Sequence, residues 1–117
     1  MKENNLKNKC SLFSIRIVKL AKHLHAEHKE FVMSRQILKS GTSVGANVSE
    51  SENGESKLDF IHKLGIAQKE INETIYWLDL YFATDYLTEK EYVSIHTNAV
   101  EIKKIITTII RITKSNL

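Results

Sequence analysis

The sequence of 117 residues contains no proline and a single cysteine. At an average usage of about 5%, a chain of this length would hold around six prolines. Proline interrupts helices and is frequent in the turns of β-proteins, so its absence favours long unbroken helices over a β-sandwich or barrel. Cys10 alone cannot form an internal disulfide, which argues against a disulfide-stapled secreted scaffold.

Long apolar runs are also missing from this chain. No segment approaches the roughly 18 consecutive apolar residues of a transmembrane helix. The first residues, Met1–Asn5, lack the apolar core and the small-residue cleavage site of a secretory signal. We therefore expect a cytoplasmic protein that has no membrane partner.

The remaining composition is that of an ordinary folded domain. Hydrophobic residues make up 42% of the chain and charged residues 26%, which excludes intrinsic disorder. A chain of this size buries roughly two-thirds of the surface that it exposes when unfolded, so it needs no metal or disulfide for stability. We predict a flexible segment at residues 1–8 and one domain at residues 9–115.

Apolar residues recur at helical spacing in four segments, which predict helices at about 9–26, 32–51, 56–83 and from 88 nearly to the C-terminus. Ser56 and Thr88 are predicted N-caps, and Thr88 with Glu91 has the spacing of a capping box. Gly54 is predicted to turn the chain through the left-handed conformation. Short connections favour an all-α, antiparallel up-down-up-down four-helix bundle.

The second predicted helix has an unusually small inner face. Gly41, Gly45 and Ala46 lie within it, and each glycine costs about 1 kcal/mol of helix propensity relative to alanine. Tertiary contacts must compensate for that cost. We therefore expect a neighbouring helix to pack closely against these residues.

The third and fourth helices are apolar over more than one stripe. The third helix carries a second stripe that consists of Phe60, Ala67, Thr74, Trp77 and Tyr81. The fourth helix has six isoleucines between positions 102 and 112. Surplus apolar surface of this kind favours self-association, although a monomer with a wide core is the alternative.

Charge is distributed unevenly along the chain. The net charge of +3 conceals +6 in residues 1–39, −7 in residues 50–101 and +4 in residues 102–117. A basic helix surface attracts phosphate backbones, whereas the simpler interpretation is a solvated helix face. The candidate nucleic-acid-binding residues are Arg16, Lys19, Lys22, Lys29, Arg35 and Lys39. No aromatic residue interleaves them in sequence, so base stacking is not predicted.

No constellation of residues predicts catalysis or a bound metal. His25 and His28 lie three positions apart, but the chain has no His-Glu-x-x-His motif and no Glu followed three residues later by His. Glu70 and Glu73 fit surface charges better than an acid–base pair. We expect a protein that is not an enzyme and that uses no cofactor.

Three segments carry a resemblance to a known family: the run from Ser40 to Glu50, the run from Asp59 to Ala67, and Glu70-x-x-Glu73-x-x-Tyr-Trp-Leu. Over roughly residues 10–115 the chain resembles the four-helix-bundle family of proteins encoded in intervening sequences of bacterial 23S ribosomal RNA genes, often labelled S23 ribosomal protein. It is also similar to the accessory protein of diversity-generating retroelements, a basic bundle that binds nucleic acid and a reverse transcriptase.

The resemblance implies a homo-oligomeric ring, a pentamer, without catalytic activity. By the same resemblance, packing or assembly surfaces would include the motif positions Ser43, Asn47, Glu50, Phe60, Glu73 and Trp77. Tyr81 joins this group as a member of the second apolar stripe.

The sequence leads to two hypotheses about function. The first is a non-enzymatic oligomer that binds RNA, in particular ribosomal RNA, through the basic surface of the first helix. The alternative is a structural adaptor that binds a protein partner without nucleic acid.

Overall fold

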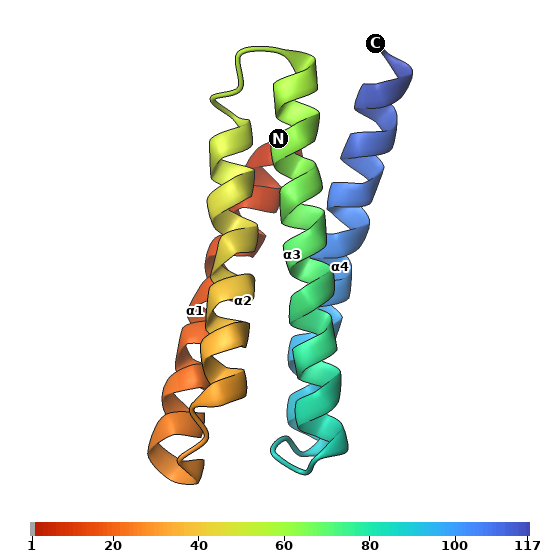
Figure 1. The fold of residues 1–117 in the computed structure, drawn as a ribbon. Coiled ribbons are helices and arrows are strands. Elements are labelled where there is room, and N and C mark those ends of the chain that lie inside the picture. The colour runs from red at the N-terminus through yellow and green to blue at the C-terminus, as the bar shows by residue number, and fades with distance from the viewer. Residues whose placement is uncertain (1) are drawn as a thin grey trace.

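The computed structural model describes residues 2–117, and the side chains of residues 5–117. Within this range the chain forms four helices and no strand: α1 (Lys2–His28), α2 (Val32–Ser51), α3 (Lys57–Ala83) and α4 (Glu89–Ser115). Successive helices run antiparallel through short loops, and both termini lie at the same end of the bundle (Figure 1). The predicted all-α bundle is confirmed.

The helix boundaries follow the predicted caps. The Ser56 side chain accepts a hydrogen bond from the backbone N–H of Asp59, as expected of an N-cap. Thr88 and Glu91 form the predicted capping box, in which each side chain accepts from the other residue's backbone N–H. These bonds satisfy N–H groups that the first helical turn leaves without partners.

The N-terminal boundary differs from the prediction. We expected a flexible segment at residues 1–8 and a helix from about Lys9, but α1 already begins at Lys2. Leu6 is only 2% exposed and belongs to the core, which gives the additional turns of helix an apolar anchor. Met1 lies outside the described residues.

The turn at Gly54 also differs from the prediction. Gly54 does not have a positive φ; the left-handed conformation occurs instead at Lys29 (φ 53°) and Asp85 (φ 69°). These two residues lie in the loops that follow α1 and α3. The chain therefore leaves α1 and α3 through a non-glycine residue whose backbone conformation L-amino acids rarely adopt.

Close packing between α1 and α2 explains the small face of α2. A Cβ atom on Gly41 would lie 2.8 Å from Cγ2 of Ile17, and one on Gly45 would lie 3.3 Å from Oγ of Ser14. The prediction is therefore confirmed for both glycines. It is wrong for Ala46, which is exposed to solvent.

The second apolar stripe of α3 is mostly core. Ala67, Thr74 and Tyr81 are fully buried, so Tyr81 does not lie on an assembly surface as predicted. The reason is that α3 packs against both α2 and α4, which requires an apolar arc wider than one seam. Phe82, next to Tyr81 in sequence, is 38% exposed.

A buried carboxylate joins the start of α2 to α3. Glu30 accepts hydrogen bonds of 2.8 Å from the backbone N–H groups of Val32, Met33 and Ser34, and one of 2.9 Å from the Tyr81 hydroxyl. Burial raises the pKa of Glu30, but these four bonds outweigh it and leave the pKa below its ordinary value. Glu30 thus caps α2 as an anion.

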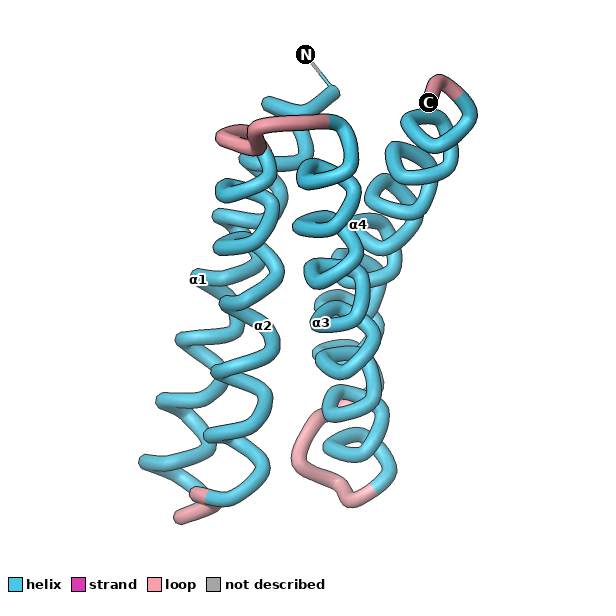
Figure 2. Tube along the Cα trace, turned by 45° about the horizontal axis from the view of Figure 1, so that its top comes forward, coloured by secondary structure: helices cyan, strands magenta, loops and turns pink. Residues whose placement is uncertain are grey.

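The side of the bundle between α1 and α4 is the most open. The C-terminal half of α4 leans away from the other helices (Figure 2). Fewer residues of α1 approach α4 than approach α2. None of the helices in residues 2–117 combines the length and the apolar character required to cross a membrane.

Candidate nucleic-acid interface

The structure distributes the six predicted nucleic-acid-binding residues over α1, α2 and the loop between them. Lys19 and Lys22 are exposed on α1, and Arg35 and Lys39 are exposed on α2. Lys29 lies in the loop between the two helices, where its Nζ donates a 3.3 Å hydrogen bond to the carbonyl oxygen of Ala26. The sixth residue, Arg16, is engaged with α4.

Arg16 forms a polar clamp between α1 and α4. Its Nη1 donates to Oδ1 of Asn98 and, at 3.3 Å, to the carbonyl oxygen of Ser94. Its Nη2 donates to the Ser94 hydroxyl at 3.0 Å. The guanidinium therefore holds the two helices together, so our assignment of Arg16 as a free phosphate ligand needs correction.

Cationic residues from both helices line this side of the bundle. The α1–α4 face, as we call it, carries Lys9, Arg16, Lys19, Lys90 and Lys104. Lys9 forms a 3.2 Å ion pair with Glu101. For Lys19, Lys90 and Lys104, the described part of the chain contains no ion-pair partner. Lys104 belongs to the basic segment 102–117, whereas Lys90 lies in the acidic segment and the sequence gave no signal for it.

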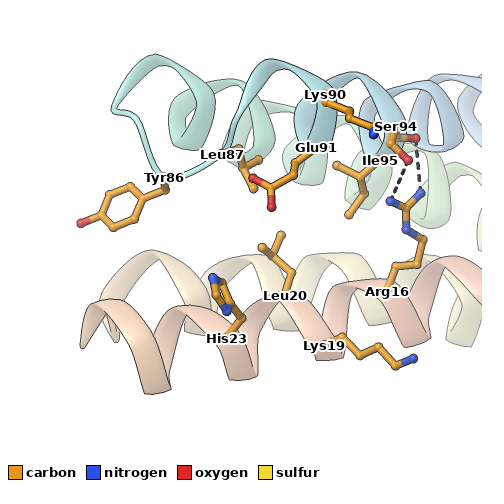
Figure 3. A pocket seen from close by; sticks show the side chains of 10 residues that line it. All are labelled: Arg16, Lys19, Leu20, His23, Tyr86, Leu87, Lys90, Glu91, Ser94 and Ile95. Atoms are coloured by element: carbon orange, nitrogen blue, oxygen red, sulfur yellow. Dashed lines mark hydrogen bonds between the residues drawn. The ribbon is translucent and has the colours of Figure 1, made fainter.

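One opening on the α1–α4 face lies between the C-terminal half of α1 and the start of α4. This α1–α4 cleft has a volume of about 480 Å³. Leu20, Leu87 and Ile95 form its apolar floor, whereas Lys19 and Lys90 lie at its rim (Figure 3). A cleft of this size is within the range of small-molecule binding sites.

Aromatic side chains close one end of the cleft. The ring centroids of Tyr86 and His28 lie 5.3 Å apart, and those of His28 and His23 lie 5.5 Å apart. Both pairs have edge-to-face geometry. His23 and Tyr86 line the cleft itself. No aromatic residue interleaves the basic residues in sequence, but Tyr86, which lies more than 60 positions after Lys19, lines the same cleft in the fold.

Glu91 is the carboxylate inside the cleft. Its Oε1 accepts a 2.9 Å hydrogen bond from the backbone N–H of Thr88. The backbone and side-chain hydrogen bonds with Thr88 lower the pKa of Glu91, so it is ionised at neutral pH. The carboxylate points into the space between α1 and α4 (Figure 3).

A second hollow continues the α1–α4 face beyond the Arg16 clamp. It has a volume of about 540 Å³ and is lined by Asn5 and Lys9 from α1 and by Lys104 and Ile105 from α4, among others. The two hollows extend the cationic surface along most of the bundle. This continuity suits an extended polyanion better than a single small ion.

The small polar residues of α2 serve the fold. Ser40 accepts a 2.9 Å hydrogen bond from the buried hydroxyl of Thr74, which ties α2 to α3. Ser43 and Asn47 donate to carbonyl oxygens within α2. Glu50 pairs with Lys63 of α3 at 3.2 Å. The bonds of Ser40 and Glu50 thus link α2 to α3, whereas those of Ser43 and Asn47 stay within α2.

The aromatic part of the family motif lies on α3. Phe60 is half-buried against the core. Trp77 is also half-buried, and its indole N–H donates a 3.3 Å hydrogen bond to Glu73. The adjacent Tyr76 is 59% exposed and contacts the Trp77 ring edge-to-face. Trp77 and Tyr76 thus form an aromatic pair at the surface.

Neither Cys10 nor the histidines form a recognisable reactive centre. Burial raises the pKa of the Cys10 thiol to about 12, so the neighbouring Lys9 does not activate it. His25 is half-buried, and its Nε2 has no hydrogen-bond partner among the described residues. In residues 2–117 no three His, Cys, Asp or Glu side chains gather as metal ligands.

Comparison with known proteins places these features in context. The family described as 23S rRNA-intervening sequence protein matches residues 2–108. A crystal structure of a protein of unknown function from the S23 ribosomal protein family of Bacteroides thetaiotaomicron VPI-5482 superposes with a TM-score of 0.93 at 53% identity. The match covers 95% of this chain and 99% of the Bacteroides chain. No curated protein matches the chain.

Proposed function

Since the chain belongs to the 23S rRNA-intervening sequence protein family, we propose that it is a non-enzymatic, cytoplasmic protein that binds RNA, in particular ribosomal RNA, through its α1–α4 face. The observation that carries this proposal is the convergence of cationic residues from α1 and α4 on one face. The family's name refers to intervening sequences of 23S ribosomal RNA, which is the reason for choosing this RNA as the first ligand to test.

Charge and accessibility support this assignment. Lys19, Lys90 and Lys104 are exposed and lie along two consecutive hollows. The acidic residues of α2 and α3, such as Glu50 and Glu73, are engaged with Lys63 and Trp77 on the other side of the bundle. A phosphate backbone that follows the α1–α4 face therefore avoids these acidic residues of α2 and α3, and the carboxylates that it passes are Glu91 and Glu101, the latter paired with Lys9.

The test is binding of a 23S ribosomal RNA fragment, measured by fluorescence anisotropy at several salt concentrations. Replacing Lys19, Lys90 and Lys104 with Gln removes three phosphate contacts. We expect the affinity to fall at least tenfold and the slope of log K against log [salt] to become less steep by about 2 to 3.

The matched control replaces Lys57, Lys69 and Lys114 with Gln, since these exposed lysines lie outside the two hollows. This variant loses the same charge and should retain nearly all of its affinity. Equal losses in both variants would indicate nonspecific attraction, and undetectable binding of the wild type would refute the proposal.

A second candidate function is a homo-oligomeric adaptor that binds a protein partner. The specific observation is the surface pair of the exposed Tyr76 and the half-buried Trp77 on α3, because aromatic residues are enriched at protein interfaces. Native mass spectrometry of Trp77→Ala tests the assembly. We expect a ring, such as a pentamer, for the wild type and a smaller species for the variant; an unchanged mass would remove this pair from the assembly surface.

A further inference from the structure

The α1–α4 cleft combines an apolar floor, an aromatic end and one oriented carboxylate. Leu87 and Ile95 in its floor are 9% and 5% exposed, so the floor is continuous with the bundle core. Tyr86 and His23 supply ring surfaces at one end. Apolar side chains, aromatic rings and a carboxylate do not bind phosphate groups, which the lysines at the rim attract instead.

From this geometry we propose that the α1–α4 cleft accepts one unpaired nucleobase of the bound RNA, and that it selects bases with an exocyclic amino group. The proposal rests on the RNA-binding function proposed above and names what the RNA inserts. The base lies on the apolar floor, while its flanking phosphates face Lys19 and Lys90 at the rim.

The dimensions and the lining favour a base over a purely ionic ligand. A volume of about 480 Å³ exceeds what a phosphate ion needs. Proteins that bind single-stranded RNA commonly combine a positively charged groove with aromatic and apolar surfaces on which bases stack. Here the sequence separates these two components, and the bundle brings them together.

Glu91 supplies the selectivity. One of its oxygens is occupied by the backbone N–H of Thr88, and no described side chain donates to the other. An ionised carboxylate accepts a hydrogen bond from the amino group of cytosine, whereas the corresponding carbonyl of uracil presents a second acceptor. Cytosine and uracil have similar size and stacking surface, so they isolate this contact.

The experiment compares three 5′-labelled RNA octamers of equal charge: oligocytidine, oligouridine and an octamer of abasic ribose phosphates. Anisotropy at low salt should give the tightest binding for oligocytidine. We expect about fivefold weaker binding for oligouridine and a further loss of about fivefold or more for the abasic chain.

Glu91→Gln tests the contact directly. Glutamine can still cap α4 through its carbonyl oxygen, but it then presents an N–H₂ donor to the base. The preference for oligocytidine over oligouridine should disappear or reverse. The control Glu89→Gln removes an equal charge from the same helical turn, outside the cleft, and should keep the preference.

A second readout locates the base. Cytidine monophosphate added to the ¹³C-methyl-labelled protein should shift the methyl signals of Leu20, Leu87 and Ile95, whereas ribose 5-phosphate should leave them in place. Methyl shifts without binding of any octamer or of the 23S ribosomal RNA fragment would show a nucleotide site in the cleft but refute the RNA function and the insertion of an RNA base.

The outcomes separate this inference from the proposed function. Equal affinity for all three octamers would refute the base site while the RNA function survives. Absence of binding to every octamer, together with absence of binding to the 23S ribosomal RNA fragment, would overturn both. An oligocytidine preference that persists in Glu91→Gln would refute the role of Glu91.

Discussion

The α2–α3 and α1–α4 sides of the bundle are built differently. Between α2 and α3, buried polar groups meet directly: Glu30 contacts Tyr81, and Thr74 contacts Ser40. Between α1 and α4 the main polar link is the Arg16 clamp, flanked by two hollows. One side thus fixes the fold, while the other retains accessible apolar and cationic surface that a ligand can use.

The largest loss of stability is expected from a substitution that removes the polar contacts on the α2–α3 side. Glu30→Ala leaves three backbone N–H groups and the Tyr81 hydroxyl without their acceptor. We expect a loss of roughly 3 kcal/mol in the free energy of unfolding, measured by urea denaturation. The exposed Glu27→Ala is the control and should change stability by less than about 0.5 kcal/mol. Similar losses in both variants would contradict the capping role.

The same carboxylate makes stability depend on pH. Because folding lowers the pKa of Glu30 from its ordinary value of 4.5, its contribution is present above that value and is lost as the pH falls through the folded pKa. We expect Glu30→Gln to be less stable than the wild type at neutral pH and to lose less stability on acidification. Parallel stability curves from about pH 6 to 3 would count against this origin of the pH dependence.

Gly41→Ala tests the close approach of α1 and α2. Its Cβ would lie 2.8 Å and 2.9 Å from the γ-carbons of Ile17, which is fully buried and has little freedom to move. The overpacking should exceed the gain in helix propensity and destabilise the protein by about 1 to 2 kcal/mol in urea denaturation. Ile17→Ala removes both γ-carbons, so in that background Gly41→Ala should no longer destabilise the protein, which would confirm that the two residues compete for space.

Arg16→Ala probes the open side. The clamp is only partly buried, and water can replace its hydrogen bonds. We therefore expect a loss of about 1 kcal/mol or less in the free energy of unfolding. The neighbouring Lys19→Ala should have almost no effect on stability. A loss as large as that of Glu30→Ala would show that the two sides of the bundle are not as different as their packing suggests.

Gly65→Ala should have the smallest effect and the opposite sign. Nothing lies within 4 Å of a Cβ atom at this position, so alanine meets no neighbour. Higher helix propensity should then stabilise the protein by about 0.5 to 1 kcal/mol. Thermal denaturation should show a correspondingly higher midpoint, and a lower midpoint would mean that the backbone at Gly65 has another role.

Local patterns predicted most of the fold. The spacing of apolar residues identified all four helices, and the caps at Ser56 and Thr88 fixed the starts of α3 and α4. The cap at Glu30 was missed because the carboxylate precedes the helix by two positions and depends on Tyr81, which is 51 positions away. Its only local signal was an acidic residue just before a helix without a Ser, Thr, Asp or Asn cap.

The candidate site was predicted only in part. The basic character of α1 is visible in the sequence, and Lys19 and Lys22 are exposed as expected. The sequence could not show that Arg16 reaches Ser94 and Asn98, nor that Lys90 joins the basic residues of α1. Both depend on which helices become neighbours, and the periodicity of a single helix carries no information about that.

The sequence by itself determined that this protein is four uninterrupted helices, because the absence of proline and the recurrence of apolar residues act within each segment. The tertiary structure decided which surfaces remain open. Ala67, Thr74 and Tyr81 are buried in the core because α3 packs against both α2 and α4. The tertiary structure also joined Tyr86 and Glu91 to the basic surface of α1, because α4 closes the bundle loosely against that helix.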